Sequence, residues 1–224
     1  MTYLSEEQHK IVSDAVAEAE LQTSGEILTV LAGRSDGYTD VALWWAAGLG
    51  FTVMSLFAAF PHWLTGMLDW IAGGWGTEWT NGQLLTWQVA IGLAAFLLAL
   101  LAQLWSPLRF FLIPPPVKTA RVHEQAIKHF KVGAERRTHG RTGVLIYLSM
   151  DEHRAEIVAD RPIAAKVDAE VWGEAMGDML AEIKQGRIAE GMAAGVRDVG
   201  FVLAQHFPRG AEDENELPDR LIVV

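Results

Sequence analysis

The chain has 224 residues, a formal net charge of −10 and no cysteine, and 50% of its residues are hydrophobic. The absence of cysteine excludes disulfides, cysteine-ligated zinc and thiol catalysis. The acidic balance argues against nucleic acid as a partner, because binding to phosphates requires a basic surface.

The first 40 residues predict one helix and one buried strand. Ser5 and Gln8 have the spacing of a capping box, and apolar residues follow at helical intervals. Glu20 is expected on the exposed face of this helix, with the other acids. The segment Glu26–Leu31 is almost continuously apolar, which is typical of a strand buried on both faces.

Two long apolar runs follow, Val41–Phe60 and Leu84–Trp105, and neither contains a charged side chain. Each run is long enough for a helix to cross a bilayer, which takes about 20 residues. A pair of helices in a soluble protein would show a polar face, and these runs show none. We therefore predict a transmembrane hairpin over residues 41–105, with spans at 41–60 and 84–105 and a loop at 61–83.

Lysine and arginine predict the orientation of this hairpin. The loop Pro61–Gln83 contains neither residue, whereas Arg34 precedes the first span and several basic residues follow the second. The positive-inside rule then places both chain ends in the cytoplasm and the loop outside. The loop is rich in tryptophan, and we expect Trp63, Trp70, Trp75 and Trp79 at the membrane interface. A patch that binds a partner protein is the alternative.

The chain after the hairpin predicts helices and a β-hairpin. Pro114–Pro116 is expected to form a stiff linker that stops a helix. A basic helix then covers about Lys118–Arg137. Its Lys118 and Arg121 could contact anionic lipid headgroups, or they could simply obey the positive-inside rule. Two strands, Gly143–Ser149 and Arg154–Asp160, are predicted to pair, and helices are expected from Asp168 to Gln185 and over Ile188–His206.

The two soluble pieces are expected to form one α/β domain. The first piece offers a single strand, which cannot satisfy its backbone alone. Together the pieces predict a helix–sheet–helix sandwich that is interrupted by the hairpin. The domain then consists of residues 1–40 and 106–209, followed by an acidic tail at 210–224. We expect residues 210–218 to be mobile, and the pattern does not place the apolar end at 221–224.

Acidic residues follow the strands of this predicted sheet. If the first two strands are parallel, their carboxyl ends meet at one edge, which gathers Asp36, Asp40, Asp151 and Glu152. Carboxylate oxygens are the ligands that Ca²⁺ and Mg²⁺ prefer, so these acids predict a site for one of these ions. The alternative is that they are turn and cap residues in water. Asp160 is expected at the opposite edge.

Several short segments resemble the TPM domain, in particular the bacterial membrane-bound branch of that family with an inserted membrane hairpin. The resemblance lies in Glu20–Ile27, Thr142–Ser149 and Ala155–Asp160, with further matches in Gly186-Arg187, Glu190-Gly191, His206–Pro208 and Asn215–Pro218. It implies an α/β sandwich. Asp160-Arg161-Pro162 departs from the glycine-rich turn of the soluble members.

This resemblance implies two classes of function. Some members are linked to acid phosphatase activity and to calcium binding through clustered acids. Others are accessory factors of membrane complexes, and the bacterial membrane branch is similar to proteins found beside LemA-type membrane proteins. Our first hypothesis is therefore an accessory or scaffold protein, held at the bacterial inner membrane and bound to another membrane protein. The second is a divalent-metal-dependent phosphatase at the membrane surface.

Overall fold

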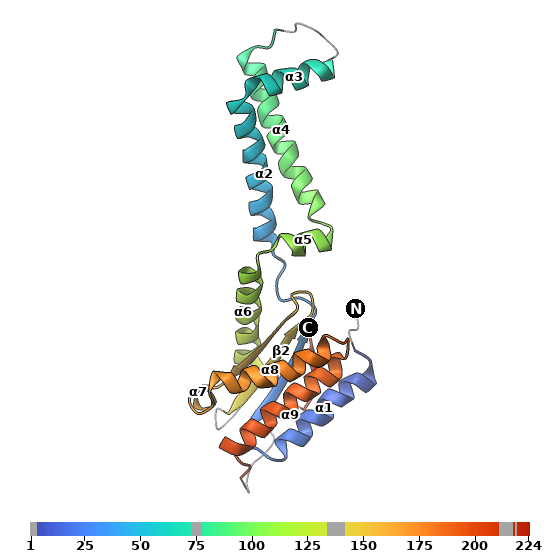
Figure 1. Ribbon diagram of the computed structural model, residues 1–224, viewed down its shortest axis with the longest axis vertical. Helices are drawn as coiled ribbons and strands as arrows, with labels where there is room; N and C mark the ends of the chain where they lie inside the picture. The colour runs from blue at the N-terminus through green and yellow to red at the C-terminus, as the bar shows by residue number, and fades with distance from the viewer. Residues whose placement is uncertain (1–3, 73–77, 134–141, 211–216, 218) are drawn as a thin grey trace. The chain divides into compact units, whose positions relative to one another are not determined.

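The computed structural model describes residues 4–72, 78–133, 142–210, 217 and 219–224 (Figure 1). The chain folds into two units, a sheet unit of residues 1–36 and 115–224 and a hairpin unit of residues 37–114. The sheet unit contains α1 (Glu6–Glu20), β1 (Glu26–Ala32), α6 (Pro115–Gly133), β2 (Gly143–Ser149), β3 (Arg154–Ala159), α7 (Arg161–Ala164), α8 (Ala169–Ile183), α9 (Ile188–His206) and β4 (Ile222–Val223). The hairpin unit contains α2 (Thr39–Ala59), α3 (Pro61–Ala72), α4 (Asn81–Ala102) and α5 (Ser106–Leu112).

The strands form one mixed sheet in the order β3-β2-β1-β4. β1 and β2 are parallel, in register from Glu26 opposite Gly143 to Ala32 opposite Ser149, and every residue of both strands is buried. β3 is antiparallel to β2, which confirms the predicted β-hairpin. Continuous apolar runs are what a strand covered on both faces requires.

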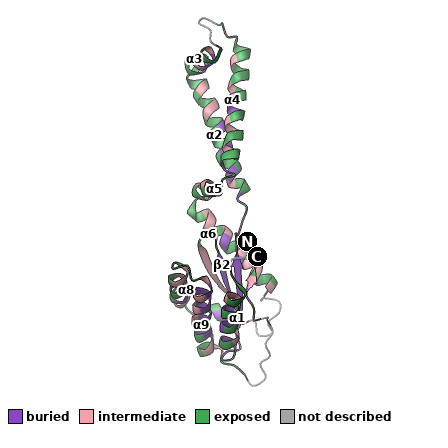
Figure 2. Cartoon of the chain, turned by 90° about the vertical axis from the view of Figure 1, so that its right-hand side faces the viewer, coloured by how far each residue is buried: buried purple, intermediate pink, exposed green. Residues whose placement is uncertain are grey.

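Helices cover both faces of this sheet, as the predicted α/β sandwich requires. On one face, α1, α8 and α9 lie side by side, and their apolar residues pack on Ile27, Val144 and Ile146 (Figure 1). On the other face, α6 packs against the sheet through Val122 and Ala126. Figure 2 shows the resulting band of buried residues along the strands.

Small residues bring the helices of the first layer into close contact. A Cβ atom added to Gly200 of α9 would lie 2.6 Å from the Cβ of Ala19 on α1. A Cβ atom added to Gly191 would lie 2.7 Å from the carbonyl oxygen of Met179 on α8. Both contacts are too short for any side chain on α9, so these two glycines let α9 pack closely on its two neighbours.

Three sequence predictions for the sheet unit are wrong. Pro115 and Pro116 do not form a linker but open α6, where a missing N–H leaves no hydrogen bond unmade. The C-terminus is not a tail beside the domain, because β4 pairs in parallel with β1 and Leu217 is buried. The predicted mobility of residues 210–218 falls mostly on residues outside the described part. Glu20 is buried instead of exposed.

The hairpin unit is built on two long helices, α2 and α4, that pack on each other along their length. By length and composition both are candidates to cross a membrane, and only 17% and 6% of the residues in their apolar segments are buried. Figure 2 shows this exposed surface. The helices approach each other closely at Gly50 and Gly92, and Gln88 of α4 donates a hydrogen bond to the Met54 carbonyl of α2 at 2.7 Å.

Short helices flank this pair. Part of the predicted loop forms α3, and α5 was not predicted as a separate helix. The base of the pair is held by polar contacts: Gln103 donates to the Ala42 carbonyl at 3.1 Å, and Trp45 donates to the Leu112 carbonyl at 3.0 Å. Tyr38 is fully buried, and its ring meets that of Phe110 edge to face at 6.0 Å.

Candidate functional site

The carboxyl edge of the sheet unit, where β1 and β2 end, gathers polar residues from three segments. Residues 34–36 follow β1, residues 150–153 form the turn between β2 and β3, and the first turns of α6 lie beside them. Arg121 of α6 pairs with Asp36 at 3.1 Å, and Gln125 of α6 donates to the Ser35 carbonyl at 2.9 Å. The sheet unit ends its first part at Asp36 and resumes at Pro115, so both connections to the hairpin unit leave from this edge.

A buried hydrogen-bonded network lies under the carboxyl edge. Ser149 donates to the Glu152 carboxylate in a short hydrogen bond, and Ser35 donates to the Ser149 hydroxyl at 2.8 Å. Because the Ser35 proton is used in this way, the Tyr147 hydroxyl donates to Ser35 at 3.0 Å. The backbone N–H of Ser35 also donates to Glu152, at 3.1 Å. The hydrogen bonds of this network are therefore all directed toward one buried carboxylate.

Burial also affects the aromatic groups of this network. It raises the pKa of the Tyr147 hydroxyl, an effect that the Ser35 hydrogen bond opposes and the charge of Glu152 reinforces. His129 of α6 stacks on the Tyr147 ring at 5.6 Å, and burial lowers the pKa of this histidine. Tyr147 therefore stays a hydrogen-bond donor, and His129 is favoured in its neutral form.

The structure brings three of the four predicted metal ligands to this edge, and each of the three interacts with another side chain there. Asp36 pairs with Arg121, Asp151 pairs with Arg34 at 3.0 Å, and Glu152 belongs to the buried network. Asp40 lies instead in the first turn of α2, in the hairpin unit. In the part of the chain that the structure describes, no three histidine or acidic side chains form a group that could hold a metal ion. Ca²⁺ or Mg²⁺ binding stays a prediction.

The opposite edge of the sheet holds buried acids that sequence reasoning missed. Glu20 accepts a hydrogen bond from the Ile27 N–H at 2.8 Å, and Glu26 accepts one from the Leu217 N–H at 3.1 Å. Burial, together with the charges of Glu26 and Asp219, raises the pKa of Glu20 to about 9, although the Ile27 hydrogen bond opposes this. Asp160 lies at this edge, as predicted, and accepts from the Gly143 N–H at 3.0 Å.

The predicted membrane-interface residues fall on three segments. Trp63 and Trp70 are exposed on α3, and Trp79 precedes α4 and donates to Asp69 at 2.8 Å. Trp75 lies outside the described residues. Lys118 and Arg121 are half-buried on the first turns of α6. Their contact with lipid stays a prediction.

The two helical layers of the sheet unit differ in charge. On α1, α8 and α9, ten acidic side chains that are exposed or half-buried stand against two basic ones, Lys10 and Arg197; the acids are Glu6, Glu7, Asp14, Glu18, Glu170, Glu174, Asp178, Glu182, Glu190 and Asp198. On α6 basic side chains outnumber acidic ones: the bases are Lys118, Arg121, Lys128 and Lys131, and the acid is Glu124. The unit is therefore basic on one layer and acidic on the other.

Comparisons with known proteins agree with this architecture. A protein-family model described as TPM domain matches residues 117–201, from the start of α6 into α9. The NMR structure of BA42 protein from the psychrophilic bacterium Bizionia argentinensis is similar, with a TM-score of 0.56 and 19% sequence identity, over 99% of this chain and 95% of that chain. No curated protein matches the chain. Over residues 117–201, the chain is therefore similar to the TPM domain family.

Proposed function

We propose that this protein is an accessory factor of a membrane protein complex, a TPM domain that its inserted hairpin holds at the cytoplasmic face of the membrane. The observation that carries the proposal is the exposed apolar surface of α2 and α4. These helices have 21 and 22 residues, and at most 17% of their apolar segments is buried. Leaving so much apolar surface in water is costly, at about 25 cal/mol per Å². A bilayer removes this cost.

The short helices at the ends of the pair support a membrane location. α5 exposes Phe111, and Trp105 just before it is also exposed. Exposed aromatic rings are typical of the headgroup region of a bilayer.

Topology is testable because the chain contains no cysteine. We would introduce single cysteines at exposed positions, Glu78→Cys before α4 and Lys128→Cys on α6. In intact cells, a membrane-impermeant maleimide should label only Glu78→Cys, and both variants should react after the membrane is opened. Labelling of Lys128→Cys in intact cells would invert the orientation. Release of the protein by carbonate washing would refute membrane insertion.

The carboxyl edge is the surface we propose for contact with the membrane partner. Residues 34–36 at this edge lead directly into the hairpin unit, which begins at Gly37. We would place a photo-crosslinking amino acid at His153, which is exposed at this edge, and at Gln185, an exposed control between α8 and α9. In native membranes, an integral membrane protein should crosslink to the first position and not to the second. Equal crosslinking, or none, would refute the assignment.

A metal-dependent phosphatase is the less supported function. The Ser149 hydroxyl and the Glu152 carboxylate form a nucleophile–base pair in geometry, but the two residues are 0% and 3% exposed and admit no substrate. Purified protein can be assayed against phosphomonoesters with Ca²⁺ or Mg²⁺, and again as Asp36→Ala and Asp151→Ala. Metal-dependent turnover that both substitutions abolish would favour the enzyme over the accessory role.

A further inference from the structure

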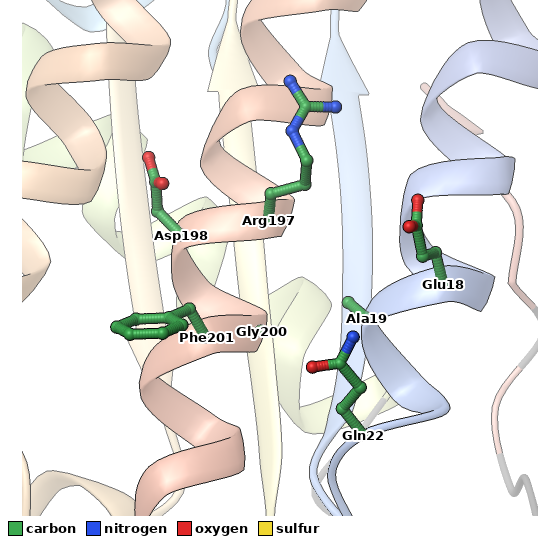
Figure 3. A pocket seen from close by; sticks show the side chains of 7 residues that line it. All are labelled: Glu18, Ala19, Gln22, Arg197, Asp198, Gly200 and Phe201. Carbon is green, nitrogen blue, oxygen red and sulfur yellow. The ribbon is translucent and has the colours of Figure 1, made fainter.

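A groove of about 420 Å³ lies on the outer surface of α1 and α9, away from the sheet and from the carboxyl edge (Figure 3). Glu18 and Gln22 of α1 line one side, and Arg197, Asp198 and Phe201 of α9 line the other. Gly200 and Ala19 form its floor, because only the Ala19 methyl group lies between the two helices there. The groove is therefore part of the helix packing and does not depend on a loop.

Phe201 supplies an apolar surface to this groove. Its side chain is 66% exposed, although the neighbouring residues Val202 and Leu203 are buried in the core. A single exposed phenylalanine is ordinary on a protein surface. This ring, however, lies beside a hollow, and aromatic side chains are enriched in protein-binding sites.

Asp198 supplies an unused acceptor. Its Oδ2 atom is shielded from solvent, and it has no hydrogen-bond partner among the described residues. Leaving a buried carboxylate oxygen unpaired is unfavourable, because the atom has lost water without gaining a donor. Burial and the charge of Asp178 on α8 raise the pKa of Asp198, and Arg197 opposes this. A cation held beside this carboxylate would favour its ionised form.

The surroundings determine the charge of the ligand. The groove lies in the acidic layer, whose ten acids outnumber its two bases, and Glu18 of α1 and Asp198 of α9 both line it, with Arg197 between them (Figure 3). This field attracts cations and repels anionic lipid and nucleic acid. We propose that the groove binds a cationic segment of a partner protein, in which an apolar side chain rests on Phe201 and a lysine or arginine donates to Asp198. This site lies on other elements than the carboxyl edge and does not depend on the proposed membrane function.

The test uses the full chain in nanodiscs of neutral lipid, with empty nanodiscs as background. The probe is a fluorescein-labelled peptide with one phenylalanine between two pairs of lysines, and its companion has glutamate for lysine. Fluorescence anisotropy should show binding of the lysine peptide only. Asp198→Asn and Phe201→Ala should each weaken binding about fivefold, the order expected for one lost contact. Phe201→Leu keeps an apolar side chain and should stay within about twofold of the parent protein.

Matched controls separate this groove from a general charge effect. Glu170→Gln removes the same charge from α8, and Val132→Ala removes an exposed apolar side chain from α6. Both controls should bind as the parent protein does. Equal weakening by Asp198→Asn and Glu170→Gln would overturn the proposal, because the peptide would then sense only net charge. Binding of the glutamate peptide would overturn it too, and so would a dimer in sedimentation that Phe201→Ala dissociates, since the occupant would be a second copy.

Discussion

The buried Glu20 carboxyl makes the stability of the sheet unit depend on pH. Glu20 ends α1, is 7% exposed, and accepts a hydrogen bond from the Ile27 N–H. Its pKa in the folded chain is about 9, against 4.5 in the unfolded chain, chiefly because burial disfavours the charged form. Between these values the folded state keeps a proton that the unfolded state releases, so the free energy of unfolding falls as pH rises.

The magnitude follows from this difference. Within the window, each pH unit removes about 1.4 kcal/mol from the free energy of unfolding. From pH 5 to pH 7.5 the loss is then about 3 kcal/mol, which is a large part of a typical stability of about 5–15 kcal/mol. Glu20→Gln removes the titration, and its amide oxygen can still accept from Ile27. We expect Glu20→Gln to be about 2–3 kcal/mol more stable than the parent protein at pH 7.5, and equal to it at pH 5.

The assay is urea unfolding of the full chain in nanodiscs, followed by circular dichroism at pH 5, 6.5 and 7.5. Glu18→Gln is the control, because it removes an exposed carboxylate from the same helix. The parent protein and Glu18→Gln should lose stability with rising pH, and Glu20→Gln should lose much less. If the slope in Glu20→Gln equals that of the parent protein, or if this variant is less stable at pH 7.5, Glu20 does not hold the proton.

Three further predictions concern packing and hydrogen bonding. Ser149→Ala removes a donor to the buried Glu152 and should cost about 1–3 kcal/mol in urea unfolding, whereas Thr119→Ala, at an exposed hydroxyl, should be near neutral. Gly200→Ala places a methyl group 2.6 Å from the Ala19 Cβ and should lower the unfolding midpoint by an amount equivalent to about 1–3 kcal/mol; Gly177→Ala, with nothing within 4 Å, should raise it. Equal effects of the two glycine substitutions would contradict the close approach of α1 and α9. Truncation after Arg220 removes the Val224 carbonyl that the Gly33 N–H reaches at 3.0 Å, so hydrogen exchange at Gly33 should accelerate while Asp160 stays protected.

Local patterns were enough to predict most of the sheet unit. β1 and β2 are continuous apolar runs, and a strand covered on both faces leaves this signature. The Ser5–Gln8 capping box forms as its spacing predicts. The bounds of α9 agree with the prediction because Arg187 and Phe207 flank an uninterrupted apolar periodicity.

Features that depend on distant pairing were not predictable. β4 has only two residues, and it is a strand only because β1 offers it an open edge about 190 positions earlier in the chain. Glu20 carries no local signal of burial, since an acid near a helix end usually faces water. The contact of Ser35 with Glu152 joins residues 117 positions apart, so no spacing rule contains it. Pro115 is compatible with a linker and with a helix start, and only the packing of α6 decides between them.

The position of the insertion follows from the sheet. β1 and β2 are parallel neighbours, so the chain must return from the carboxyl end of β1 to the amino end of β2, and α6 makes this return along one face. An insertion within α6 would break the packing of Val122 and Ala126 on the sheet. An insertion between Asp36 and Pro115 leaves both strands and α6 whole. The Arg121–Asp36 pair and the Gln125–Ser35 hydrogen bond then join the two ends of the insertion to each other.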